Sequence, residues 1–180
     1  FSFNEEEEAP FYLCTEGKFA DRIIIPFRSD DTVFYFQARA LYDQSPKYLN
    51  PSTEIAPKPS DILYPYDEEE DYLVVCEGPL DALSLQRKGI NATATIGSSI
   101  SPRQAEILST FNGKIILGYD NDEAGQRGID KFDRTRKEMR MGNFEICPPP
   151  SGYKDWNEAH MDKAQSYDFD YKAASQLNSL

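Results

Sequence analysis

Short apolar runs alternate with polar, helix-forming segments along most of the chain. Continuous apolar runs of this length are typical of strands buried on both faces, and four are found, at residues 71–76, 92–96, 114–117 and 144–147. Helices are predicted between them at residues 80–89, 101–111 and 123–141, and Ser101 with Gln104 forms a capping-box pattern at the start of the second. Crossovers of this length predict parallel strands with right-handed connections, and therefore a doubly wound sheet.

Residues before this region follow a different pattern. Two β-rich runs, 23–27 and 33–39, are separated by a polar turn and predict an antiparallel hairpin. A proline-bracketed segment follows at 46–51, carrying a cation and an aromatic residue. These patterns divide the chain into an N-terminal tether or helix, a basic subdomain, an α/β domain that ends in a short helix from Trp156, and a polar tail, at residues 1–20, 21–66, 67–165 and 166–180.

Acidic side chains follow the predicted buried strands where each strand ends. Glu77 comes directly after one strand and Asp81 one helical turn later, whereas Asp120 and Asp122 follow another strand and Asp155 follows the last. Parallel strands end at one edge of a sheet, where ligands bind in open α/β folds. Carboxylates gathered there repel one another, and a divalent metal ion removes that conflict. A single Asp-x-Asp is usually a surface turn. The hypothesis of a metal site therefore rests on the convergence of all these carboxylates at one edge of the sheet.

Composition limits the classes of protein that remain. With 180 residues and 39% hydrophobic side chains, the chain can bury one core with a smaller lobe beside it. No apolar stretch is long enough to span a membrane, which predicts a soluble, cytoplasmic protein. Because the first residue is Phe1 and not methionine, we expect a piece of a longer polypeptide.

Cysteine spacing and charge narrow the chemistry further. Cys14, Cys76 and Cys147 lie far apart, which excludes a disulfide framework and a Cys-x-x-Cys zinc site, and Cys76 is read as a core residue. A net charge of −12 argues against a protein that coats duplex DNA. Residues 17–60 stand apart, because six Lys or Arg against five Asp or Glu leave a local charge of 6 − 5 = +1.

Three ordered motifs carry a family resemblance. Glu77-Gly78-x-x-Asp81-Ala82, Asp120-x-Asp122-x-Ala124-Gly125 and Lys154-Asp155-Trp156-Asn157-Glu158 together resemble the Toprim domain shared by bacterial-type primases, topoisomerases and some nucleases. The last motif is similar to its form in phage primase-helicases. The region before it resembles the basic subdomain that precedes Toprim in bacterial-type primases, on four elements: Arg22, Gln37-Ala38-Arg39, Pro46-Lys47-Tyr48-Leu49-Asn50 and Lys58. Topoisomerases and small Toprim nucleases lack this subdomain, so the match favours a primase.

The resemblance implies a fold and a site. The expected fold is an α/β, Rossmann-like Toprim domain with a central parallel sheet, preceded by a small α+β basic subdomain. Mg²⁺ or Mn²⁺, as more than one ion, would be held by Asp120, Asp122 and Asp155. Glu77 is either a further ligand or the group that manages the proton, and Asp81 is a supporting acid. Nucleotide phosphates or the template strand would contact the cations Arg22, Arg39, Lys47 and Lys58.

The resemblance also implies an activity. The expected function is that of a DNA primase catalytic core, which joins nucleoside triphosphates into short RNA primers on single-stranded DNA. A zinc-binding domain and a replicative helicase would lie outside this chain, and the host would be a bacterial or phage-infected cell. Two alternatives remain open: a metal-dependent Toprim nuclease, and an inactive Toprim module that binds a replication partner.

Overall fold

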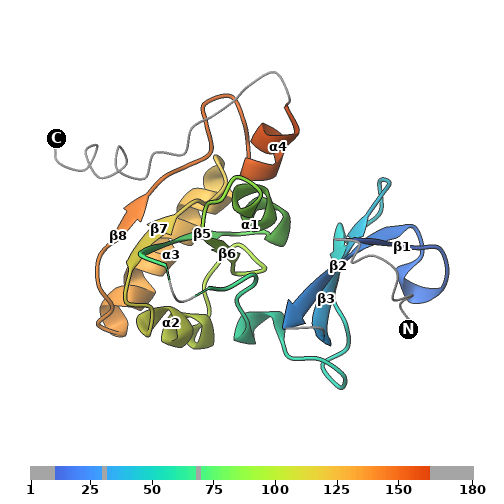
Figure 1. Ribbon diagram of the computed structural model, residues 1–180, viewed down its shortest axis with the longest axis horizontal. Helices are drawn as coiled ribbons and strands as arrows, with labels where there is room; N and C mark the ends of the chain where they lie inside the picture. The colour runs from blue at the N-terminus through green and yellow to red at the C-terminus, as the bar shows by residue number, and fades with distance from the viewer. Residues whose placement is uncertain (1–10, 30–31, 68–69, 163–180) are drawn as a thin grey trace. The chain divides into compact units, whose positions relative to one another are not determined.

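The computed structural model of the chain describes residues 11–29, 32–67 and 70–162 (Figure 1). The chain divides into two compact units, residues 1–58 and residues 59–180. The predicted C-terminal tail and the run of glutamates near the N-terminus lie outside the described residues. Each unit is considered by itself below.

The first unit is an antiparallel sheet with strand order β1-β2-β3-β4 (Figure 1). Its strands are β1 (Tyr12–Cys14), β2 (Arg22–Ser29), β3 (Thr32–Ala40) and β4 (Tyr48–Leu49), and a 3-10 turn, η1, spans Gly17–Phe19. Pairing of β2 with β3 confirms the predicted hairpin. A tether or helix is expected for residues 1–20, and the described part of that stretch contains β1 and η1. The described residues of this unit, 11–29 and 32–58, form the four strands and η1.

The second unit is built on a parallel sheet with strand order β6-β5-β7-β8 (Figure 1). The strands are β5 (Tyr72–Cys76), β6 (Ala92–Ala94), β7 (Lys114–Leu117) and β8 (Phe144–Ile146). Its helices are α1 (Pro79–Gln86), α2 (Pro102–Ser109), α3 (Glu123–Glu138) and α4 (Trp156–Met161), and a 3-10 turn, η2, spans Pro59–Asp61. All three strand pairs are parallel, which confirms the predicted doubly wound sheet.

Helices cover both faces of this sheet because its strands carry apolar residues on both sides. Along β5, Leu73 and Val75 pack into the core that contains α2 and α3 residues, such as Leu108 and Phe132. Val74 and Cys76 face the opposite core, which includes side chains of α1 and Trp156 of α4. Cys76 is fully buried, as expected.

Local sequence accounts for the helix boundaries. The predicted capping box is present: the Ser101 side chain accepts from the Gln104 N–H, and the Gln104 side chain accepts from the Ser101 N–H. Asp122 caps α3 in a similar way. None of the helices in the described ranges is long and apolar enough to cross a membrane.

Candidate active site

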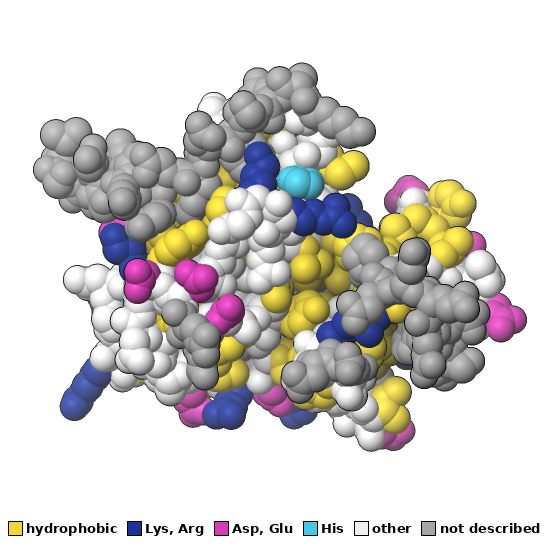
Figure 2. Space-filling view, in the orientation of Figure 1, with side chains coloured by type: hydrophobic (Ala, Val, Ile, Leu, Met, Phe, Trp, Pro, Cys, Tyr) yellow, Lys and Arg dark blue, Asp and Glu magenta, His cyan; other side chains and the backbone are white. Residues whose placement is uncertain are grey.

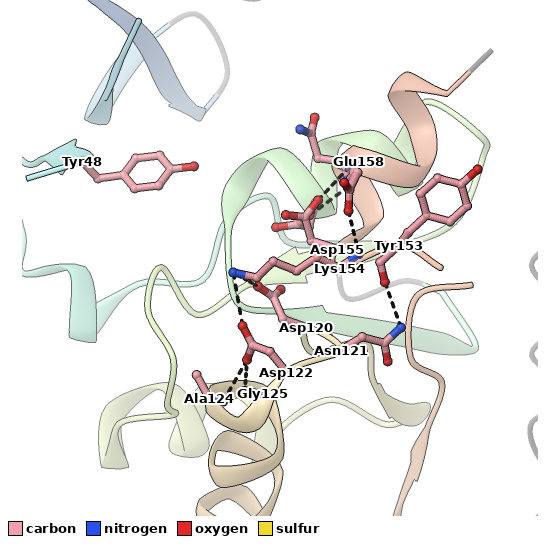
Figure 3. Close-up of polar contacts among 12 residues, drawn as sticks. Tyr48, Asp120, Asn121, Asp122, Ala124, Gly125, Tyr153, Lys154, Asp155 and Glu158 are labelled. Carbon is pink, nitrogen blue, oxygen red and sulfur yellow. Dashed lines mark hydrogen bonds and ion pairs between the residues drawn. The ribbon is translucent and has the colours of Figure 1, made fainter. Parts of the chain in front are cut away.

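The two aspartates of the Asp-x-Asp motif lie just beyond β7, in the turn that leads into α3 (Figure 3). Asp122 is the N-cap of this helix, and its Oδ1 accepts hydrogen bonds from the N–H groups of Ala124 at 2.8 Å and Gly125 at 2.9 Å. A Cβ on Gly125 would lie 2.0 Å from the backbone oxygen of Asp120. Glycine therefore allows the start of α3 to pack directly onto the backbone of Asp120.

Lys154 bridges the two aspartates. Its Nζ lies 3.2 Å from Asp122 Oδ2 and 3.9 Å from Asp120 Oδ2 (Figure 3). The Gly125 N–H and then Lys154 lower the pKa of the Asp122 carboxyl, and the hydrogen bond to Asp122 raises the pKa of the Lys154 ammonium. The pair is thus already compensated by one positive charge.

Glu77 follows β5, the neighbour of β7 in the sheet. Burial raises the pKa of its carboxyl to about 7, with a further contribution from the charge of Asp120. Its Oε1 is buried and has no hydrogen-bond partner. A carboxyl group in this setting is close to half-protonated at neutral pH, and a nearby cation would favour its ionised form.

Asp81 and Asp155 both accept backbone hydrogen bonds from α4. The buried Asp81 accepts from the Asn157 N–H through Oδ1 at 3.0 Å, which ties α1 to α4. Asp155 is the N-cap of α4, and its Oδ1 accepts from the Glu158 N–H at 2.7 Å. Asp81 therefore contributes to the packing of α4 against α1. The hydrogen bond of Asp155 stabilises the start of α4.

The donor set fits one divalent ion more readily than several. Within the residues that the structure describes, no group of three or more Asp, Glu, His or Cys side chains is placed to hold a metal. Mg²⁺ in proteins is nevertheless commonly bound by one or two carboxylates, with water and phosphate oxygens completing its shell. Asp120 and Asp122 share a cation already, and the buried oxygen of Glu77 lacks a partner. These residues fit an ion at the Asp120–Asp122 pair.

Sequence reasoning missed the part that Asn121 plays at this site. Its N–H donates to the backbone oxygen of Lys154 at 2.8 Å, and its Nδ2 donates to the backbone oxygens of Pro149 at 2.9 Å and Tyr153 at 3.1 Å (Figure 3). The residue between the two aspartates thus holds the loop that carries Lys154. In the sequence, the only indication of this role is that Asn121, with its amide side chain, lies between the two candidate ligands.

Arg22 does not have the role expected for it. Its side chain is 5% exposed, and its guanidinium donates to the backbone oxygens of Ala38 at 3.3 Å, Lys47 at 3.3 Å and Pro46 at 3.0 Å. These contacts join the end of β3 to the segment before β4. Arg22 therefore braces the first unit from inside and does not present its charge to a phosphate.

Three other cations of the first unit are at least partly exposed. Arg39 donates to the Tyr48 hydroxyl at 2.9 Å, and its guanidinium lies 5.6 Å from the centre of that ring. The ammonium of Lys47 lies 5.9 Å from the same ring. Lys58 is exposed. Figure 2 shows where cationic and acidic side chains reach one face of the surface. Arg39 and Lys47 thus form a small cationic group around Tyr48.

Arg22→Met is expected to lower the free energy of unfolding of the first unit by about 2 to 4 kcal/mol, because buried carbonyl oxygens lose a charged donor. Hydrogen exchange of the Ala40 amide, which donates to the Lys47 oxygen, reports the loss locally. Lys58→Met removes one charge from an exposed side chain and is the control, with a change of about 0.5 kcal/mol or less. Equal stability of the two variants would contradict the bracing role.

Comparison with known proteins places this geometry in a family. Residues 74–160 match the family model described as Toprim-like, a span that includes every carboxylate of the site. The strand order, the two helical layers and the acidic motifs at the carboxyl ends of β5 and β7 agree with that match. The second unit is a Toprim domain.

Relatives identify the kind of Toprim protein. A DNA primase from Thermotoga maritima is 34% identical over 151 residues, which cover 78% of this chain and 26% of the relative. The E. coli primase catalytic core superposes with a TM-score of 0.66 at 27% identity, covering 83% of this chain and 52% of that one. The zinc-binding and RNA polymerase domains of the Aquifex aeolicus primase superpose with a TM-score of 0.64 at 27% identity, covering 94% of this chain and 43% of that one.

These matches confirm the resemblance: the chain belongs with the Toprim-containing catalytic cores of bacterial, DnaG-type DNA primases. The chain spans about a quarter of the length of the curated primases it matches, at 26%, 21% and 24% for three of them. Similarity to the E. coli and Aquifex aeolicus structures extends across both units.

Proposed function

We propose that this chain is the catalytic core of a DNA primase, which joins ribonucleotides into short RNA primers on a single-stranded DNA template. The observation that carries the proposal is the Asp120–Asp122 pair beyond β7, within a Toprim domain. The neighbouring strand β5 leads into Glu77, whose buried Oε1 has no hydrogen-bond partner. Primer synthesis needs an acidic site of this kind for nucleotidyl transfer.

The carboxylates divide the work of the proposed reaction. A bound Mg²⁺ or Mn²⁺ would lower the pKa of the attacking 3′ hydroxyl and neutralise charge on the triphosphate. Asp120 and Asp122 would hold the ion, and Asp155 is a candidate for a second ion or a further ligand. Glu77 is suited to accept the hydroxyl proton, since a group with a pKa of about 7 exchanges protons readily at neutral pH. Asp81 would keep α1 and α4 in place.

The first unit would supply contacts to phosphates. Arg39 presents a planar guanidinium that suits bidentate phosphate recognition, whereas Lys47 and Lys58 act as point charges. The charged groups of Arg39 and Lys47 both lie within 6 Å of the centre of the Tyr48 ring, at 5.6 and 5.9 Å. We assign triphosphate or template contacts to these three cations. A zinc-binding domain and a replicative helicase are proposed as partners that deliver the template.

Incubation with a single-stranded template, labelled ribonucleotides and Mn²⁺ tests the proposal. Short RNA products support primase activity, and their absence in an Asp120→Asn control links them to this site. Cleaved template without RNA would instead show the Toprim nuclease. Neither product, together with capture of a helicase, would indicate an inactive binding module. The primase-like first unit favours the first outcome.

Single-stranded DNA is expected to bind weakly, with a dissociation constant on the order of 10⁻⁴ to 10⁻⁶ M at physiological salt and a shallow salt dependence. Few cations cluster in the first unit, and the net charge of −12 opposes a polyanion. Lys47→Ala should weaken binding and reduce the salt slope by about 0.7, the value for one phosphate contact on a single strand. Fluorescence anisotropy over a salt series measures both.

The matched control for that experiment is Lys88→Ala, which removes the same charge from an exposed position in the second unit. Its slope should equal that of the unaltered chain. Tight, steeply salt-dependent binding by the unaltered chain would reveal a larger basic surface than the one assigned here. Loss of Mn²⁺ affinity in Lys47→Ala would contradict the separation of phosphate and metal contacts.

A further inference from the structure

We propose that Lys154 is a built-in counter-ion, which holds the metal position while the site is metal-free and moves onto the triphosphate when a divalent ion binds. The inference deepens the proposed function and rests on it. Its basis is the bridging position of the Lys154 ammonium, 3.2 Å from Asp122 Oδ2 and 3.9 Å from Asp120 Oδ2 (Figure 3).

The backbone on which this ammonium is carried is fixed on both sides. The Lys154 N–H donates to Glu158 Oε2 at 2.6 Å, and its backbone oxygen accepts from the Asn121 N–H at 2.8 Å. Asn121 lies between the two aspartates, so the loop and the carboxylates are held in one arrangement. The direction of the Lys154 side chain toward the pair therefore follows from backbone contacts and not from chance surface attraction.

The side chain itself remains free to leave. It is 59% exposed, and its recorded ion pairs are to the same two carboxylates. A divalent ion at the same distance attracts each carboxylate about twice as strongly as an ammonium does, because Coulomb energy scales with charge. Metal binding would therefore displace the ammonium. Its four-carbon stem then lets the charge reach a phosphate oxygen coordinated nearby.

This arrangement has two consequences of opposite sign. In the metal-free protein Lys154 competes with the ion, so removing it should tighten metal binding. Once the ion and a triphosphate are bound, Lys154 adds an attraction to the phosphate, so removing it should weaken triphosphate binding. A side chain that merely supports the fold would shift both affinities in the same direction.

Titration calorimetry on the 180-residue chain tests both consequences. With Mn²⁺ alone, Lys154→Met is expected to bind the ion about fivefold more tightly, the effect of removing an exposed ion pair. With ATP added at saturating Mn²⁺, the same variant should bind the nucleotide about fivefold more weakly. Lys154→Arg keeps the charge, so its affinities for Mn²⁺ and for ATP should both stay within about twofold of those of the unaltered chain.

Lys88→Met is the matched control, because it removes the same net charge from the turn between α1 and β6. It should leave both affinities unchanged. Equal or weaker Mn²⁺ binding by Lys154→Met overturns the counter-ion role, as does unchanged ATP binding. If the unaltered chain binds no Mn²⁺, or if Asp122→Asn binds it equally well, the metal site of the proposed function fails instead, and the counter-ion role fails with it.

Discussion

Asp122→Asn is expected to reduce primer synthesis by roughly 10²- to 10³-fold, the loss typical of removing one preorganised electrostatic group. The free energy of unfolding should change by less than about 1 kcal/mol, because asparagine caps a helix nearly as well as aspartate. The amide oxygen can still accept from the Ala124 and Gly125 N–H groups, so α3 keeps its start. What disappears is the charge shared by Lys154 and the proposed ion.

Two measurements check this prediction. Primer yield at saturating ribonucleotide gives the loss of activity, and melting curves with and without Mn²⁺ give metal binding, because an ion bound only by the folded state raises the midpoint. Asp130→Asn, on the same helix, is the control and should behave as the unaltered chain does. Unreduced primer synthesis by Asp122→Asn would remove Asp122 from the metal site.

The sign of the stability effect could not be obtained from the sequence. Read alone, two carboxylates at i and i+2 repel, and removing one should stabilise the metal-free fold. In the structure Lys154 lies between them, and the pKa of Asp122 is lowered. Its contribution to stability is present above the ordinary carboxyl pKa and is lost as pH falls through the lowered one. The carboxylate therefore favours the folded state.

Elements specified by local pattern were predicted correctly. The apolar runs of β5 and β7 and the capping box at Ser101 require only neighbouring residues to be recognised. Their parallel arrangement followed from the length of the crossovers and placed Glu77 and Asp120 at one edge of the sheet. The short strands β1 and β4 were missed because their pairing depends on strands formed elsewhere in the chain.

Side-chain roles set by three-dimensional environment were harder to predict. Arg22 looks like any other cation of the basic stretch, yet three carbonyl oxygens from distant residues enclose it. The sequence places Lys154 in a motif but does not predict its ion pairs, since its partners lie more than thirty positions away along the chain. Sequence indicates which charges are present, whereas burial and the direction of each backbone segment decide which of them are available.

Glu77→Gln is expected to stabilise the metal-free protein near pH 8 by about 1 to 3 kcal/mol, while reducing primer synthesis by roughly 10²-fold. Burial holds the pKa of this carboxyl at about 7 in the folded chain, against an ordinary value of 4.5. Below pH 4.5 Glu77 is protonated in both the folded and the unfolded chain, so it does not lower the free energy of unfolding. Between pH 4.5 and 7 the unfolded chain loses its proton first, so stability falls as pH rises, and the full cost is reached above pH 7.

Urea denaturation in EDTA, compared near pH 4 and near pH 8, measures this cost. Glutamine cannot ionise, so the variant and the unaltered chain should agree at the lower pH and diverge at the higher one. Glu106→Gln alters an exposed glutamate of α2 and should show no such divergence. A constant difference across the range would mean that Glu77 has an ordinary pKa.

Adding Mn²⁺ separates the electrostatic cost from the catalytic role of Glu77. A cation near the Asp120–Asp122 pair favours the ionised form of Glu77 and lowers its pKa, so the pH-dependent loss of stability should shrink in the unaltered chain. Glu77→Gln, which has no charge to compensate, should gain less from the ion. If Mn²⁺ leaves the pH dependence of the unaltered chain unchanged, the ion does not bind within reach of Glu77, and the proton-transfer role proposed for this residue loses its basis.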